Sequence, residues 1–247
     1  VTFDADTNIV PMLAKEWSMS DDGLSYTFVL NEGITFHDGE PFNAEAVIAN
    51  WERGRSDQSL RIYTQTQSWV SAVADSEYQL TITLDEPNNT FLNKLTQVRI
   101  ISPKAIEEWG QDGLAKQSAG TGPYILSERV DGGYTKMVRN ENYWGEQPYY
   151  DEVIVKYIPD ASARLQALQN GEIDLIYGSA LLTWDDYQQA TSLPNIAGAV
   201  AESDSKTRNL VLNASGVLSD LKVREAVAYA IDKETLSEGL TYGEETP

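Results

Sequence analysis

The scarcity of histidine and cysteine limits the chemistry that this sequence can perform. His37 is the only imidazole among 247 residues, and cysteine is absent. Zinc sites are built from several cysteine, histidine or carboxylate ligands, and a serine nucleophile needs a neighbouring base. The sequence also contains no Gly-x-Ser-x-Gly elbow beside which His37 could act. We therefore expect no catalytic residue, no metal site and no resident cofactor.

The two turn-rich motifs favour structural roles. His37 lies in the sequence Phe36-His-Asp-Gly-Glu-Pro41, where Asp-Gly and proline favour tight turns. The loop Gly120-Thr-Gly-Pro123 lacks the Lys-Ser/Thr pair of a phosphate-binding loop. We expect His37 to be exposed or bonded within its turn and the glycine loop to be a structural turn.

Arg99 has the clearest binding chemistry. It lies in the otherwise apolar segment 95–103, in a chain with 18 Lys and Arg against 38 Asp and Glu. A guanidinium in apolar surroundings is costly unless it meets a carboxylate, which matches its planar donor geometry. That carboxylate belongs either to this chain or to a ligand, and the residues alone favour an ion pair within the chain.

The net charge of −20 excludes whole classes of partner. Such a surface repels nucleic-acid phosphates and anionic lipids, so we expect no nucleic-acid partner and no docking on membranes by charge. Neighbouring acids such as Asp185 and Asp186 leave open a secreted hydrolase with paired carboxylates, although solvated surfaces explain such pairs more simply. The apolar stretches are too short to span a bilayer.

The periodicity of apolar residues predicts a mixed α/β (α+β) fold. Alternation indicates strands at 24–30 and 78–84 of the antiparallel type, and apolar runs indicate further strands at 153–158, 173–177 and 210–212. Capping residues and helical spacing indicate helices at 43–53, 91–95, 103–109, 160–171 and 220–231. A further helix is predicted to begin at residue 183. The polar stretch 202–208 is the best candidate for a linker.

Several motifs, in order along the whole chain, resemble the family of extracytoplasmic solute-binding proteins that serve ABC importers for peptides and nickel (family 5). The longest of them are Gly33-Ile-Thr-Phe-His-Asp-Gly-Glu-Pro-Phe42, Val138-Arg-Asn-Glu-Asn-Tyr-Trp-Gly145 and Val223-Arg-Glu-Ala-Val-Ala-Tyr-Ala-Ile-Asp-Lys233. Others are 11–18, 21–30, 120–124 and 171–175. The sequence departs from the family at Asn31, where a cation is common.

The resemblance implies a lobe of the periplasmic-binding-protein type with a small extra subdomain, truncated from a two-lobed protein. Residues 1–208 would form most of lobe one, with the extra subdomain within about 30–150. Residues 209–247 would supply a strand and a helix near the hinge that lead toward an absent lobe two. On this basis we expect the sequence to be a fragment of a longer chain.

Within the family, the Tyr143-Trp-Gly145 segment resembles the nickel-binding branch. That branch holds nickel largely as a chelate, and it places an arginine before a proline-initiated helix to meet carboxylates of the chelator. Arg99 matches this position. Arg61 and Tyr63 correspond to a second arginine and an aromatic, with a different spacing and a different aromatic. The resemblance therefore implies Arg99, Arg61 and Tyr63 as ligand-binding residues, with nickel as a transported ligand.

The implied function is that of a non-enzymatic, monomeric binding component that captures chelated nickel or a short peptide and delivers it to an ABC permease and its ATPase subunits. Its location would be extracytoplasmic, in the periplasm or on the cell surface with a lipid anchor. An oligopeptide-binding protein of the same family is the alternative.

Overall fold

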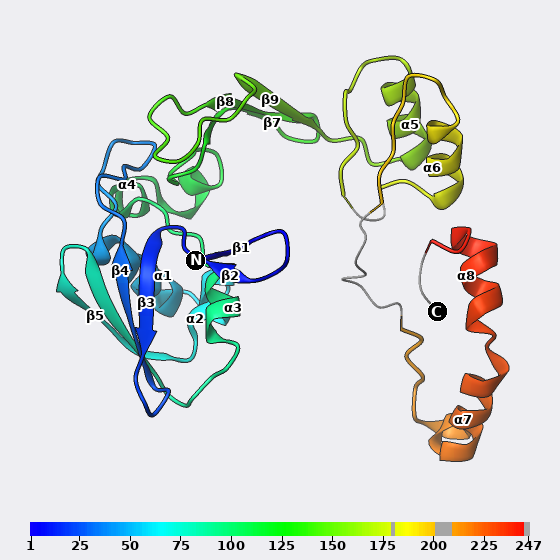
Figure 1. Cartoon of the computed structure of the whole chain (residues 1–247), viewed down its shortest axis with the longest axis horizontal. Coiled ribbons are helices and arrows are strands. Elements are labelled where there is room, and N and C mark those ends of the chain that lie inside the picture. Colours follow the sequence, from blue (N-terminus) through cyan, green and yellow to red (C-terminus); the bar gives the residue numbers. More distant parts are fainter. Residues whose placement is uncertain (179–180, 201–208, 245–247) are drawn as a thin grey trace. The chain divides into compact units, whose positions relative to one another are not determined.

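The computed structural model describes residues 1–178, 181–200 and 209–244 (Figure 1). The chain forms two compact units, Val1–Tyr157 and Ile158–Pro247. Both strands and helices occur, so the predicted mixed α/β class is confirmed. Within the described ranges, none of the helices has the length and apolar character needed to cross a membrane. The predicted division into lobes at residue 208 stays a prediction.

A four-stranded antiparallel sheet forms the centre of the first unit. Its order is β3 (Ala14–Met19), β4 (Ser25–Leu30), β6 (Gln79–Leu84) and β5 (Trp69–Ser76). A short ribbon of β1 (Thr2–Phe3) and β2 (Ile9–Val10) precedes it. The two strands predicted from alternation are direct neighbours, with Phe28 opposite Leu80 and Tyr26 opposite Ile82. Because side chains alternate along a strand, these four residues all face the core.

Three helices surround this core: α1 (Ala44–Ser56), α2 (Arg61–Thr66) and α3 (Phe91–Leu95). The side chain of Asn43 caps α1 by accepting a hydrogen bond from the Ala46 amide at 3.0 Å. The buried face of α1 includes Val47 and Trp51, which join the sheet residues in one apolar cluster. The predicted helices at 43–53 and 91–95 are therefore confirmed.

The rest of the first unit consists of α4 (Pro103–Leu114) and the antiparallel sheet β7-β8-β9. Its strands are Tyr124–Val130, Tyr134–Arg139 and Glu152–Lys156, the last of which confirms the strand predicted at 153–158. Helix α4 begins at the predicted proline and is interrupted at Gly110, whose φ of 58° breaks the helical geometry. The predicted end near residue 109 thus corresponds to a kink, after which one further turn follows.

The second unit is helical in its described part. It contains α5 (Ala161–Gln169), α6 (Trp184–Thr191), the 3₁₀ helix Gly216–Ser219, α7 (Leu221–Ala230) and α8 (Lys233–Thr241). The predicted caps are present: Asp160 begins α5, Asp220 begins α7, and Thr183 with Asp186 forms the capping box of α6. Local sequence signals thus determine the helix starts of this unit.

The strands predicted at 173–177 and 210–212 are wrong, because neither segment is a strand in the structure. A strand needs a hydrogen-bonding neighbour, and among the described residues neither segment has one. Both remain solvent-exposed, as Leu175 at 72% and Val211 at 87% show. The linker predicted at 202–208 lies outside the described residues.

The cap of α5 allows a local test. Asp160 accepts a hydrogen bond from the Ala163 amide at 2.8 Å. Replacing Asp160 with alanine should destabilise α5 by about 1 kcal/mol, the usual value of an N-cap, and should speed amide hydrogen exchange in α5 about fivefold. The exposed Asp174, which caps no helix, provides the control Asp174→Ala. Unchanged exchange in Asp160→Ala would contradict the capping role.

Candidate functional site

Arg99 lies in the connection between α3 and α4, and its side chain is exposed. Its Nη1 donates a hydrogen bond to the Thr96 carbonyl oxygen at 2.7 Å. The ion pair within the chain that the residues favoured is not formed in the described part of the structure, because Arg99 reaches solvent instead of the apolar core. The other guanidinium donors are therefore available to a ligand carboxylate.

The backbone that carries Arg99 is fixed to helix α1 by a buried amide. Asn50 has no exposed surface, and its Nδ2 donates to the carbonyl oxygens of Ala46 at 2.9 Å and Ile101 at 2.7 Å. Its Oδ1 accepts from the Ile101 amide at 3.1 Å. The next residue, Ser102, is also fully buried and donates its amide to the Ala119 carbonyl at 2.8 Å. The polar contacts of Ile101 and Ser102 thus hold the backbone that carries Arg99.

Arg61 and Tyr63 lie on the short helix α2, which contacts α3. The exposed Arg61 donates from Nη2 to the side-chain oxygen of Gln97 at 3.0 Å. Since Gln97 is two residues before Arg99, this bond links Arg61 to the segment that carries Arg99. Tyr63 is half-buried. A ligand-binding role for these three residues stays a prediction.

His37 has a structural role, but the prediction that it is exposed or bonded within its turn is wrong, because it is half-buried and its ring bonds to the loop that contains the glycines. The His37 imidazole bonds to the Ser118 hydroxyl through Nδ1 at 2.5 Å and to the Gly122 carbonyl through Nε2 at 3.0 Å. The Trp144 indole donates to the Thr121 carbonyl at 3.1 Å. The two histidine bonds tie the turn at 36–41 to the segment 118–122 and engage both ring nitrogens, while the indole bond ties that segment to Trp144.

Neither the acids nor the histidine gathers into a metal centre in the part of the chain that the structure describes, since no group of three or more such ligands lies within reach of one ion. The adjacent acids Asp185 and Asp186 have other partners. Asp186 completes the capping box of α6, and Asp185 accepts a hydrogen bond from the Tyr242 hydroxyl at 2.6 Å. This bond to an anion raises the pKa of Tyr242.

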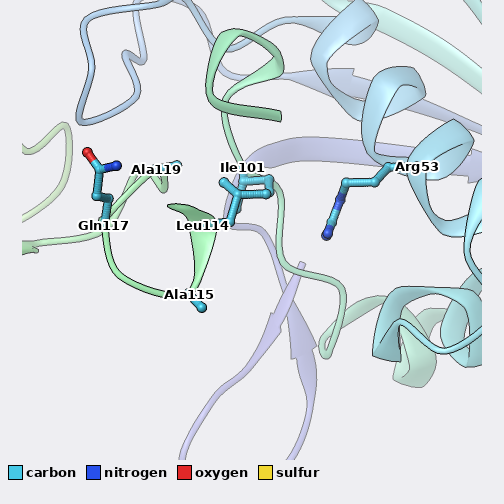
Figure 2. A pocket seen from close by; sticks show the side chains of 6 residues that line it. All are labelled: Arg53, Ile101, Leu114, Ala115, Gln117 and Ala119. Carbon is cyan, nitrogen blue, oxygen red and sulfur yellow. The ribbon is translucent and has the colours of Figure 1, made fainter. Parts of the chain in front are cut away.

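The structure also reveals a pocket of about 300 Å³ that the sequence did not indicate. Figure 2 shows Arg53 extending from α1 toward it, with the other walls formed by Ile101, Leu114, Ala115, Gln117 and Ala119. Arg53 belongs to the predicted helix α1, but its local sequence carried no signal for a pocket, because the other lining residues are distant in the sequence. None of Arg99, Arg61 and Tyr63 lines this pocket.

Comparison with known proteins gives a consistent result over nearly the whole chain. The model of the bacterial extracellular solute-binding proteins, family 5 Middle, matches residues 8–247. The nickel-binding periplasmic protein of Escherichia coli (strain K12) is 34% identical over 249 residues, which cover 98% of this chain and 47% of that protein.

Two solved structures show the same architecture. NikA from Brucella suis in complex with Fe(III)-EDTA is 34% identical, with a TM-score of 0.86, covering 98% of this chain and 50% of that one. DppA from Helicobacter pylori in complex with the peptide STSA is 27% identical, with a TM-score of 0.76, covering 98% and 52%. The chain thus spans about half the length of the relatives that it matches.

Proposed function

The chain belongs to the family 5 bacterial extracellular solute-binding proteins, which are not enzymes, and on this premise we propose that it is part of the substrate-binding component of an ABC importer. The complete protein would capture a small ligand outside the cytoplasm and deliver it to a membrane permease coupled to ATPase subunits. The family is extracellular, and we propose the periplasm, or the cell surface with a lipid anchor, as the location.

The proposed ligand is a chelated metal ion, with nickel as the transported ion. The observation that carries this choice is the greater similarity to the chelate-bound relative, with a TM-score of 0.86 against 0.76 for the peptide-bound one. Small metal chelators present carboxylates, and an exposed guanidinium without an ion-pair partner matches their charge and planar shape. Arg99 is exposed and forms no ion pair with any residue that the structure describes.

In this proposal, Arg99 anchors the chelator carboxylates while Arg61 and Tyr63 form the neighbouring wall of the cleft. The Arg61–Gln97 bond holds the guanidinium of Arg61 beside the segment that carries Arg99. Two guanidinia in this region would also offset the repulsion that a chain with a charge of −20 exerts on an anionic chelate. Closure of the complete protein about its hinge would then enclose the ligand.

A peptide ligand is the second candidate, because a peptide-bound relative also matches 98% of the chain. The C-terminal carboxylate of a short peptide could occupy the same place on Arg99. Extended peptides are held mainly by main-chain hydrogen bonds, so their binding should depend less on one arginine.

A titration of the full-length protein with Ni²⁺–histidine and with short peptides tests the proposal. We expect saturable binding of the nickel chelate, weakened about 10- to 100-fold by Arg99→Ala because a charge-assisted bond is lost. Arg129→Ala is the matched control, since Arg129 is ion-paired with Asp131 at 3.1 Å and should not alter affinity.

Binding of peptide but not of the chelate would replace nickel by the second candidate. Binding of neither ligand would reject the proposed ligand classes. If Arg99→Ala and Arg129→Ala bind the chelate equally well, Arg99 is not the anchor.

A further inference from the structure

The pocket beside helix α1 is lined by the half-buried Arg53, one of whose guanidinium nitrogens has no partner in the described part of the chain. The Nε atom of Arg53 is buried and has no hydrogen-bond partner among the described residues. A buried polar atom without a partner costs free energy, and one on a charged group costs more. Burial also lowers the pKa of Arg53, and the nearby Asp57 opposes this effect only in part. Arg53 thus forms no ion pair within 4 Å in the described part of the chain, and Asp57 compensates its charge only from a greater distance.

The walls of the pocket do not supply that partner in the described part of the chain, and three of their carbonyl oxygens each accept a hydrogen bond from another group. The Ile101 oxygen accepts from Asn50 at 2.7 Å, and the Ala119 oxygen accepts from the Ser102 amide at 2.8 Å. The Ala115 oxygen accepts from Arg129 at 3.0 Å, which brings a second guanidinium to the rim. Since Arg129 is itself ion-paired with Asp131 at 3.1 Å, the unpaired Nε atom of Arg53 is the feature that favours an acceptor from outside the chain.

The acid whose charge acts on Arg53 has hydrogen-bond partners of its own. Asp57 ends α1 and accepts hydrogen bonds from the Ser59 amide at 2.9 Å and the Ser59 hydroxyl at 2.6 Å. These bonds lower the pKa of Asp57, the charge of Arg53 lowers it further to a smaller extent, and the carboxylate is held by Ser59 of the following loop. Although 38 acidic residues are available, no ion pair with Arg53 forms in the described ranges.

We propose that the pocket lined by Arg53 is a binding site for a small organic carboxylate with a short aliphatic tail. The Arg53 guanidinium would bind the carboxylate, while Ile101, Leu114, Ala115 and Ala119 would contact the tail. A volume of about 300 Å³ is at the small end of ligand pockets and suits a molecule of a few carbons. This site goes beyond the proposed transport ligand and does not depend on it.

Four of the six lining residues are apolar, and this part of the wall distinguishes the proposed ligand from an inorganic anion. Phosphate or chloride could pair with Arg53 but would leave four apolar side chains in contact with water or with a charge. Each added methylene that enters the pocket should instead improve binding. Affinity should therefore increase with the length of the tail until the pocket is full.

The test uses the whole chain and nuclear magnetic resonance of the Arg53 Nε–H group, titrated with acetate, butyrate, hexanoate and inorganic phosphate. We expect a saturable shift of this resonance, with a dissociation constant of about 1 mM for the best carboxylate. Butyrate should bind about tenfold more tightly than acetate, since two more methylenes are buried. The resonance is identified by its absence in Arg53→Met.

Arg55→Met is the matched control, because Arg55 is on the same helix but lies exposed over the Trp51 ring at 5.0 Å. Binding measured by calorimetry should weaken at least about tenfold in Arg53→Met and stay unchanged in Arg55→Met. If Arg53→Met does not fold, Leu114→Trp narrows the same pocket and should weaken hexanoate binding. The proposal is overturned by the absence of a saturable shift, by phosphate binding as tightly as hexanoate, or by equal losses in the two arginine variants.

Discussion

Replacing Phe91 with alanine should lower the free energy of unfolding of the first unit by about 3–5 kcal/mol, the usual cost of deleting a buried phenyl ring. Phe91 has no exposed surface. Its ring centroid lies 4.5 Å from that of Tyr26, 6.3 Å from that of Phe28 and 6.1 Å from that of Trp69. One side chain thus joins β4, β5 and α3, and its removal leaves a cavity among rigid rings that cannot close it.

Urea denaturation followed by tryptophan fluorescence measures this effect, because five of the six tryptophans belong to the first unit. Phe3→Ala is the matched control, since Phe3 is 40% exposed and should lose less than about 1 kcal/mol. A loss of similar size in both variants would show that Phe91 is not a centre of the core.

Phe91 also explains why a short helix could be predicted from the sequence. Helix α3 has only five residues and no side-chain cap, so its own hydrogen bonds stabilise it weakly. The apolar spacing of Phe91 and Leu95 indicated a helix because one face had to enter a core. Alternation indicated β4 and β6 for the same reason, and their pairing follows from their buried faces.

The failed predictions concern segments whose structure depends on residues distant in the sequence. The apolar segments at 173–177 and 210–212 have the composition of buried strands, but a strand also needs a neighbour that local sequence does not specify. The relatives are about twice as long as this chain.

The candidate binding residues show the same limit. The unusual place of Arg99 could be recognised from its apolar neighbours, although the ion pair expected there does not form in the described residues. Arg53 gave no comparable signal, because its surroundings include residues 101 and 114–119, which only the fold brings to α1. Tertiary contacts of this kind cannot be inferred from one helix.

Replacing Asn50 with alanine should destabilise the first unit by about 2–4 kcal/mol, because three buried hydrogen bonds are lost and both polar groups of Ile101 lose their partner. The more specific result concerns the Ile101 amide, whose hydrogen exchange should become much faster in Asn50→Ala. Asn93→Ala is the matched control on the exposed side of α3 and should change neither quantity. Unchanged exchange at Ile101 would refute the role of Asn50 in holding this segment.

The variant Asn50→Asp separates the acceptor from the donor at this position. Its carboxylate could still accept from the Ile101 amide but would face the carbonyl oxygens of Ala46 and Ile101, which Asn50 now satisfies. Burial and these oxygens should raise the pKa of the new carboxyl above its unfolded value. Between the unfolded and the folded pKa the folded state then binds more protons than the unfolded state, so stability should increase as the pH falls through the folded pKa toward the unfolded one. Urea denaturation of Asn50→Asp and Asn50→Ala between neutral and acidic pH should show this gain only for Asn50→Asp, and parallel profiles would contradict it.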